Sequence, residues 1–269
     1  MDAKINHLAI VSENYALSAR FYESLFGMRT AKVSRPRRAV TVGDGYLGLN
    51  INPRKAGRPA RLDHFGIEVD DMAEAFERLR RDYPQVAWLK RPDSRPFAAT
   101  TTHDPDGNVF DLSQRRNGSQ KDLYAEDNPV TARRVSHFGL RTLNPDLVAT
   151  FYAETFDLRL TRRANDPNAY VSDGQVTIVI MPWRITDYDG TGIVSPSLDH
   201  IGFTVERMET FRADLETIAG DNPRLAPFPF GTGSEGIARL ELARRSCPLC
   251  GEHLADVDGV ILAAAEESR

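Results

Sequence analysis

Short apolar segments that alternate like β-strands recur four times along the chain, and each is followed by an amphipathic helical pattern. The helices are predicted over residues 14–28, 70–80, 144–158 and 206–219, where apolar side chains recur at three- and four-residue spacing. After each helix the pattern returns to strands and glycine-containing turns, including the stretch 238–266 near the C-terminus. The predicted unit is therefore β-α-β-β-β, and the chain contains it four times.

The repeat is visible in the residues themselves, and a repeat decides the architecture of a chain. Residues 5–30 align with residues 135–160 without a gap, and the segment LDHFGIEVDDM at 62–72 aligns with LDHIGFTVERM at 198–208. The alignment puts one histidine in each of the four first strands, namely His7, His64, His137 and His200. The chain is thus predicted to consist of two similar halves of two modules each.

A polar, charged stretch without hydrophobic period separates the two halves. We expect an N-terminal domain over residues 1–116, a linker over 117–132, and a C-terminal domain over 133–269. The second domain would carry an insertion that contains both cysteines.

Composition and charge exclude several classes of protein. The 269 residues are 41% hydrophobic and 27% charged, as in ordinary globular proteins. A net charge of -4 gives no support for a nucleic-acid or anionic-membrane partner. No apolar run approaches the roughly 20 residues of a membrane span, and the N-terminus lacks a signal-peptide pattern, so a cytoplasmic protein is expected. Cys247 and Cys250 are too close together to form a disulfide framework.

Four such modules, a histidine in each first strand, and the hairpin DPDGNVFDL at residues 104–112 resemble the vicinal oxygen chelate superfamily. This superfamily includes glyoxalase I, extradiol dioxygenases, and the bleomycin- and fosfomycin-resistance proteins. The resemblance covers nearly the whole chain. It implies an α+β fold in which the four βαβββ modules pair through pseudo-twofold axes into two cup-shaped mixed β-sheets.

The resemblance also implies a metal site in the first cup. The pseudo-twofold would place His7 opposite His64, and in the family a carboxylate on the last strand completes the site; Asp111 holds that position, where the family usually has Glu. Two histidines and one carboxylate suit one divalent metal, with Fe(II) favoured and Mn(II) or Zn(II) as alternatives. The corresponding position on the last strand of module one is Gly48 or Asn50, and neither residue is a strong ligand. Alternatively, the histidines are hydrogen-bonded core residues and Asp111 caps a strand.

The second cup lacks an equivalent set. Its ligand positions carry Val179 and Ala263, so His137 and His200 would hold a divalent metal only weakly. We therefore expect this half to be a degenerate copy that serves structure, pocket walls or dimerisation. Extradiol dioxygenases with two cups have the opposite plan, with their metal in the C-terminal half.

The segment CPLCGEH at residues 247–253 is similar to a metal knuckle of the rubredoxin or zinc-ribbon kind. Cys247, Cys250 and His253 offer three ligands for a structural Zn(II), with the fourth from elsewhere in the chain or from a second copy in a homodimer. Two alternatives remain open: a pair of reduced thiols at a surface hairpin, or a redox-active pair.

Candidate residues for chemistry and substrate contact complete the first cup. His103 is expected to share a strand face with Thr101 and to act as a general acid or base near neutral pH, or else to form hydrogen bonds at the adjacent turn. The predicted substrate pocket contains Asn50, Trp88, Phe97 and Thr101.

The function favoured by the resemblance is that of a metal-dependent dioxygenase, an oxidoreductase acting on a small metal-chelating substrate that resembles a catechol or hydroquinone. A glyoxalase-like lyase or isomerase is the first alternative, and the missing second carboxylate counts against it. A resistance-type protein that binds a small molecule without turnover is the second alternative. All enzymatic hypotheses depend on the convergence of His7, His64 and Asp111.

Overall fold

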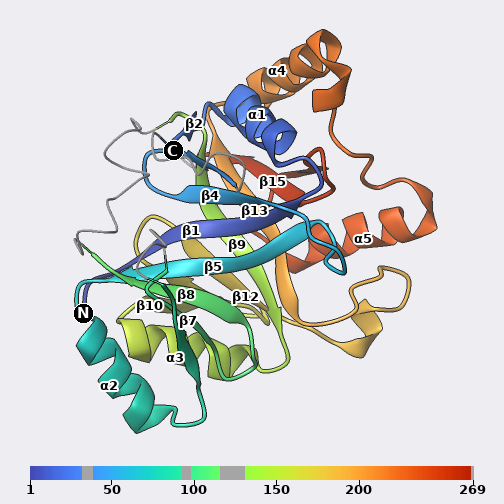
Figure 1. Cartoon of the computed structure of the whole chain (residues 1–269). Helices are drawn as coiled ribbons and strands as arrows, with labels where there is room; N and C mark the ends of the chain where they lie inside the picture. Colours follow the sequence, from blue (N-terminus) through green and yellow to red (C-terminus); the bar gives the residue numbers. More distant parts are fainter. Residues whose placement is uncertain (32–38, 93–97, 116–130, 268–269) are drawn as a thin grey trace.

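The computed structural model describes residues 1–31, 39–92, 98–115 and 131–267. These residues form two mixed β-sheets and five α-helices, and Figure 1 shows the helices at the sides of the sheets. The expected fold class is confirmed: the protein is α+β, and its modules pair into two sheets.

The first sheet has eight strands in the order β2-β3-β4-β1-β5-β8-β7-β6. Its strands are β1 (Ala3–Ser12), β2 (Arg29–Thr30), β3 (Val40–Gly43), β4 (Gly48–Pro53), β5 (Arg61–Val69), β6 (Trp88–Lys90), β7 (Thr100–His103) and β8 (Val109–Gln114). The two first strands, β1 and β5, pair antiparallel at the centre, while β1 pairs parallel with β4 and β5 pairs parallel with β8. This arrangement gives the sheet the expected pseudo-twofold between modules one and two.

The second sheet repeats this plan with seven strands in the order β10-β11-β12-β9-β13-β15-β14. Its strands are β9 (Arg134–Thr142), β10 (Arg159–Arg162), β11 (Ala169–Ser172), β12 (Thr177–Pro182), β13 (Ser197–Val205), β14 (Glu252–Ala255) and β15 (Ile261–Glu266). Again the two first strands, β9 and β13, pair antiparallel at the centre.

All four predicted helices are confirmed. They are α1 (Tyr15–Phe26), α2 (Met72–Asp82), α3 (Pro145–Phe156) and α4 (Met208–Asp221). Local chemistry sets their ends: the Asn14 side chain accepts a hydrogen bond from the amide of Leu17, and Asp71 accepts from the amides of Ala73 and Glu74. Gly27 has a φ of 68°, the left-handed conformation that ends α1.

The final module departs from the predicted strand pattern. Residues 238–246, expected in strands and turns, belong instead to a fifth helix, α5 (Gly233–Ser246). The run ARLELAR consists of strong helix formers, and this propensity outweighs its partial alternation. Two 3₁₀ turns, η1 (Ile185–Asp187) and η2 (Pro223–Leu225), also lie in this half.

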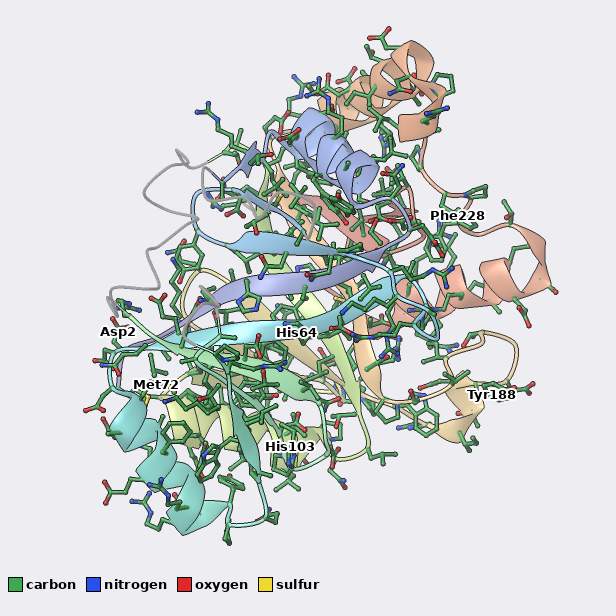
Figure 2. The ribbon with its side chains drawn as sticks, viewed as in Figure 1. Asp2, His64, Met72, His103, Tyr188 and Phe228 are labelled. Carbon is green, nitrogen blue, oxygen red and sulfur yellow. The ribbon has the colours of Figure 1, made fainter. Side chains whose placement is uncertain are left out.

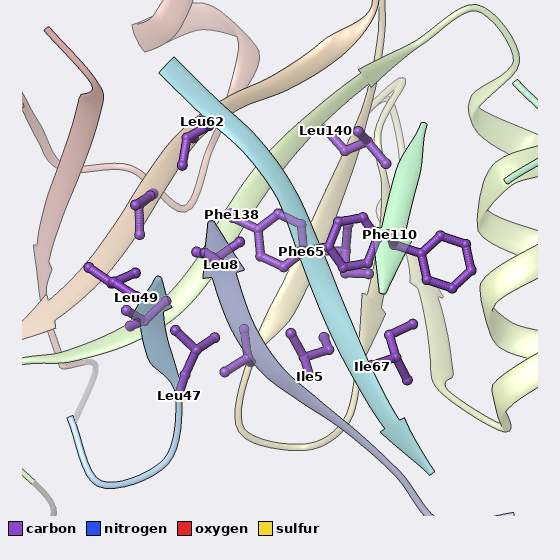
Figure 3. Packing of buried hydrophobic residues seen from close by; sticks show 14 of the residues in the cluster. Ile5, Leu8, Leu47, Leu49, Leu62, Phe65, Ile67, Phe110, Phe138 and Leu140 are labelled. Carbon is purple, nitrogen blue, oxygen red and sulfur yellow. The ribbon is translucent and has the colours of Figure 1, made fainter. Parts of the chain in front are cut away.

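The two sheets share one hydrophobic core, part of which Figure 3 shows. The ring of Phe65 on β5 lies 5.0 Å from that of Phe138 on β9, measured between centroids. Phe26 of α1 stacks at 3.8 Å on Phe203 of β13. Because side chains alternate along a strand, His64, the neighbour of Phe65, points to the opposite face of the first sheet, and Gly66 opens onto that same face. That face carries the candidate site.

The predicted linker over 117–132 lies almost entirely outside the described residues, so the domain boundaries remain predictions. Among the residues that the structure describes, no helix combines the length and the apolar character that a membrane crossing requires.

Candidate metal centre

Three predicted ligands converge on the face of the first sheet that points away from the shared core. His7 on β1, His64 on β5 and Asp111 on β8 each offer one ligand atom within 4.8 Å of the other two. The Nε2 atom of His64 lies 3.3 Å from Oδ2 of Asp111, and Nε2 of His7 lies 3.9 Å from the same oxygen. His7 and Asp111 are buried, whereas the side chain of His64 is 22% exposed. The cluster is therefore accessible from the side of His64.

Strand register brings the three side chains together. Gly66 on β5 pairs with His7 on one side and with Asp111 on the other. A Cβ atom at Gly66 would lie 2.0 Å from Cε1 of His7, a distance that no packing tolerates. The absence of a side chain at Gly66 thus leaves room for the His7 imidazole beside Asp111.

Two β-bulges orient the imidazole rings. The pairing of β1 with β5 skips Asn6 in one strand and Asp63 in the other. Such bulges re-aim side chains, and here each polar residue lies beside the histidine that follows it. Nδ1 of His7 lies 2.8 Å from Oδ1 of Asn6, and Nδ1 of His64 lies 2.9 Å from Oδ2 of Asp63. With both Nδ1 atoms engaged, Nε2 of each ring is the atom that could bind a metal ion.

The electrostatics of the cluster favour a positive charge at its centre. Burial lowers the pKa of His7 to about 3. Burial also acts to lower the pKa of His64, but hydrogen bonds to Asp111 and Asp63 outweigh it and raise that pKa to about 9. Burial acts to raise the pKa of Asp111, yet the hydrogen bond with His64 holds it below its ordinary value. Without a metal, a proton on His64 offsets one of the two negative charges of Asp63 and Asp111.

The residues fit a divalent metal ion. Ligand atoms at about 2.0–2.2 Å from a metal are separated from one another by roughly 2.9 Å in octahedral and 3.4 Å in tetrahedral geometry. The observed separations of 3.3 and 3.9 Å are close to these values. Two imidazole nitrogens and a carboxylate suit Fe(II), Mn(II) or Zn(II), and three protein ligands leave coordination positions open.

Two of the predicted pocket residues lie on the same face as this cluster. Thr101 pairs with Asp111 across β7 and β8, donates a hydrogen bond to its carboxylate, and accepts one of 2.7 Å from Nε of Arg91. Asn50 on β4 pairs with Ala9 on the first strand of module one, and Asp111 on β8 pairs with Gly66 at the equivalent point of the first strand of module two. Asn50 therefore occupies the position in module one that Asp111 has in module two.

The prediction for Trp88 needs a correction. Trp88 pairs with Thr102, so it lies on the opposite face of the sheet, where its ring centroid is 5.1 Å from that of Phe76 on α2. Successive side chains of a strand point to opposite faces of the sheet, so the next residue, Leu89, is the one that shares the face of Thr101. Leu89 pairs with Thr101 and is 60% exposed. Leu89 therefore lies on the face that carries the cluster, where the sequence placed Trp88. Phe97, also predicted in the pocket, lies outside the described residues.

His103 lies at the end of β7, apart from the three ligands, and Figure 2 shows it separated from His64. Its Nδ1 is 2.7 Å from the carbonyl oxygen of Asp104, and its Nε2 accepts a 3.1 Å hydrogen bond from the amide of Ala87. Both ring nitrogens are therefore engaged by the main chain. The acid or base role remains a prediction, and these contacts count against it.

A second cluster lies in the second sheet. His137 on β9, His200 on β13, Cys247 and Cys250 bring four ligand atoms within 4.8 Å of one another. The expectation that this half retains only two imidazoles is wrong, because the segment after α5 brings two thiols to them. His253, predicted as the third ligand of the knuckle, is not part of this set.

The positions expected to lack a ligand do lack one. Ala263 pairs with Gly202 as Asp111 pairs with Gly66, and Val179 pairs with Gly139 as Asn50 pairs with Ala9. These four register relationships confirm the alignment of the modules. The thiols therefore reach the histidines from a different part of the module.

A polar residue that was not among the predicted site residues precedes each of the four histidines. In the second half, Oγ of Ser136 is 3.1 Å from Nδ1 of His137, and Oδ2 of Asp199 is 3.0 Å from Nδ1 of His200. Together with the first half, the four partners are Asn6, Asp63, Ser136 and Asp199. A polar residue directly before a histidine, inside an otherwise apolar strand, is the sequence feature that could have identified them.

Comparison with known proteins agrees with this fold. Residues 4–112 match the family model of the Glyoxalase/Bleomycin resistance protein/Dioxygenase superfamily. This segment is a domain of that superfamily, which confirms the resemblance drawn from the sequence. No curated protein sequence matches the chain.

Solved structures with the same fold cover both halves. A catechol 2,3-dioxygenase is 12% identical, with a TM-score of 0.60, and the match covers 99% of this chain and 88% of that one. The Mn(II)-bound glyoxalase from Novosphingobium aromaticivorans is 14% identical, with a TM-score of 0.62, over 99% of this chain and 82% of that one. A xylose isomerase-like TIM barrel/4-hydroxyphenylpyruvate dioxygenase fusion protein is 16% identical, with a TM-score of 0.55. The match covers 81% of this chain but only 38% of the fusion protein. At these identities the likeness establishes the fold.

Proposed function

We propose that the protein is a metal-dependent enzyme of the dioxygenase kind, an oxidoreductase that acts on a small metal-chelating substrate such as a catechol or hydroquinone. The observation that carries the proposal is the convergence of His7, His64 and Asp111 on one face of the first sheet. Fe(II) bound by such a set supplies a Lewis acid with free coordination positions.

The chain's own residues would hold this centre in one geometry. Asn6 and Asp63 fix the orientation of the two imidazoles through their Nδ1 atoms. Thr101 donates to Asp111 and so restrains the carboxylate. These contacts are of the kind that pre-organise a metal site and tune the basicity of its ligands.

The surroundings also suit a planar substrate with two anionic oxygens. The guanidinium of Arg91 donates to Thr101, which in turn donates to Asp111, and so brings a positive charge near the carboxylate of the cluster. Leu89 presents an exposed apolar side chain on the same face. Asn50 adds a neutral amide at the position equivalent to Asp111.

The neutral amide of Asn50 favours the dioxygenase over a glyoxalase-like enzyme. Glyoxalase-like chemistry in the family depends on carboxylates from both modules of a cup, one of which acts as ligand and base. Module one contributes Asn50 at this position, which cannot take up a proton at neutral pH.

Metal analysis of the full-length protein tests the proposal first. We expect about one Fe or Mn ion per chain in the wild type, in addition to any metal bound elsewhere, and the loss of this ion in His64→Ala. Asp82→Ala, which removes an exposed carboxylate on α2, is the matched control and should retain the ion. A wild type that holds no metal at these three residues after anaerobic incubation with Fe(II) would refute the proposal and leave the binding-protein alternative.

Oxygen consumption then separates the two enzymatic alternatives. The Fe(II)-loaded protein should consume oxygen with at least one member of a panel of catechols and hydroquinones, and His64→Ala should not. Turnover of a chelating substrate at the same rate without air would instead identify a lyase or isomerase.

A further inference from the structure

We propose that His137, His200, Cys247 and Cys250 form a second metal site, a closed Cys₂His₂ centre that binds Zn(II) and fastens helix α5 to the second sheet. This site is independent of the proposed first site. It lies in the half of the protein for which the sequence alone indicated no complete ligand set.

The distances among the four side chains match tetrahedral zinc. Zn–S bonds of about 2.3 Å and Zn–N bonds of about 2.0–2.1 Å imply sulfur–nitrogen separations near 3.6 Å in a tetrahedron. Sγ of Cys250 lies 3.4 Å from Nε2 of His137 and 3.4 Å from Nε2 of His200, and Sγ of Cys247 lies 3.6 Å from Nε2 of His137. All four ligands therefore already stand at coordination spacing.

The two imidazoles are oriented for metal binding. Their Nδ1 atoms face Ser136 and Asp199, which leaves both Nε2 atoms directed at the thiols. A Cβ atom at Gly202 would lie 1.9 Å from Cε1 of His137, and one at Gly139 would lie 2.5 Å from Cε1 of His200. Two side-chain-free positions thus make space for the two rings.

The thiols come from a compact turn at the end of α5. Cys247 is the C-cap residue of the helix, and the amide of Cys250 donates a 3.2 Å hydrogen bond back to the carbonyl of Cys247. A Cβ atom at Gly251 would lie 2.6 Å from the carbonyl oxygen of Ala264 on β15, so the turn needs glycine where it meets the sheet. This geometry aims both sulfur atoms at the histidines.

Ligand chemistry assigns different metals to the two sites. Two thiolates and two imidazoles are soft to borderline ligands that select Zn(II), and four protein ligands leave no open position for a substrate. Two histidines and one carboxylate at the first site retain open positions. The second site is therefore structural, and the first is the one suited to catalysis.

A metal here would strengthen the attachment of α5, which otherwise rests on few apolar contacts and on polar ones such as the ion pair of Arg239 with Asp199 on β13. Only Leu242 and Ala243 of the helix are buried. The apolar contacts of the following turn form a small cluster, separate from the main core, that consists of Tyr170, Val179, Met181 and Cys247, with Leu249 and Cys250 packed against it. Polar contacts add to it, among them the 2.8 Å hydrogen bond from Nδ2 of Asn168 to the carbonyl of Ser246. Zinc would join this segment directly to β9 and β13.

The test uses the full-length protein purified under reducing conditions. We expect about one zinc ion per chain that remains in His64→Ala but is lost in Cys250→Ala and in His200→Ala. His253→Ala is the matched control, because this histidine follows the same knuckle but lies outside the four ligands, and it should retain zinc. Loss of zinc in His253→Ala together with its retention in His137→Ala would overturn the proposed ligand set.

Cobalt substitution provides a readout that does not depend on variants that fold poorly. Co(II) bound by the wild type should show the intense visible bands of tetrahedral coordination together with thiolate-to-cobalt charge-transfer absorption. Because the chain has two cysteines in total, blocking them with a mercurial reagent should abolish the thiolate-to-cobalt bands completely, whatever Co(II) the first site holds. A metal-free wild type that contains a Cys247–Cys250 disulfide and takes up no Co(II) after reduction would refute the proposal.

Limited proteolysis tests the structural role. Removal of zinc with a strong chelator should make the segment from η2 to the knuckle, residues 223–250, cleavable at least several-fold faster, while the first sheet stays protected. Equal cleavage with and without zinc would refute the anchoring role.

Discussion

The hydroxyl of Tyr22 on α1 donates a 2.9 Å hydrogen bond to the carboxylate of Asp256, which lies 234 residues further along the chain. The other half mirrors this contact: Tyr152 on α3 donates to Asp104 at 3.1 Å. Each aspartate also accepts hydrogen bonds from main-chain amides of its own hairpin turn. The first helix of each half is thereby tied to the last hairpin of the other half.

Removal of one of these hydroxyls should destabilise the protein without disturbing either metal site. We expect Tyr22→Phe to lower the free energy of unfolding by roughly 1–3 kcal/mol, because the buried carboxylate of Asp256 loses a donor. Urea unfolding measures the change. Tyr188→Phe is the control, since Tyr188 is 54% exposed and should be neutral. An unchanged unfolding midpoint in Tyr22→Phe would show that the contact contributes no stability.

The Asp256 carboxyl should also make stability depend on pH. Burial, and then the nearby charge of Asp258, raise the pKa of Asp256 from 3.8 to about 6, against the opposing hydrogen bonds from main-chain amides and Tyr22. The folded state therefore holds this proton more tightly than the unfolded chain, so the contribution to stability is present below pH 3.8 and is lost as the pH rises through about 6.

Asp256→Asn should remove this loss. From pH 5 to pH 7 the free energy of unfolding of the wild type should fall by roughly 1 kcal/mol more than that of the variant. Urea titrations at the two pH values measure it. A difference between the two proteins that is independent of pH would contradict the raised pKa.

The two glycines that accommodate the histidines allow each metal site to be disrupted separately. Gly66→Ala places a Cβ atom against the ring of His7, and Gly202→Ala places one against His137. We expect Gly66→Ala to lose the ion of the first site and to retain zinc, and Gly202→Ala to do the reverse. Elemental analysis of both variants, with circular dichroism to verify folding, measures this. Retention of both metals in both folded variants would show that neither ring needs its observed position.

The hydrogen bond from His64 to Asp63 should contribute to metal affinity. In Asp63→Ala the imidazole loses the acceptor at its Nδ1 atom, so we expect the affinity for Mn(II) or Fe(II) to fall by about 10–100-fold. Competition with a chelator of known affinity measures the change. The exposed Asp82→Ala on α2 should bind as the wild type does, and equal affinities for the two variants would remove the proposed role of Asp63.

Much of the fold and of the first site could be predicted from the sequence because the repeat is strong. One histidine per first strand pointed to His7 and His64, and the family resemblance added Asp111 on the last strand to the candidate set. The helix α5 was missed because strand-like alternation and helix propensity conflict in its residues, and only packing decides between them. The misplacement of Trp88 has a simpler cause, since a register error of one residue moves a side chain to the other face of a sheet.

The sequence by itself determined the four modules and the position of each histidine, because these follow from local periodicity and from internal repetition, while the pairing of the modules came from the family resemblance. Only the tertiary structure decided which side chains meet the histidines. The bulges that turn Asn6 and Asp63 toward their neighbours depend on pairing between strands that are distant in the sequence. Cys250 reaches His137 across 113 residues, because the path of an insertion is set by the surface on which it packs rather than by its own sequence.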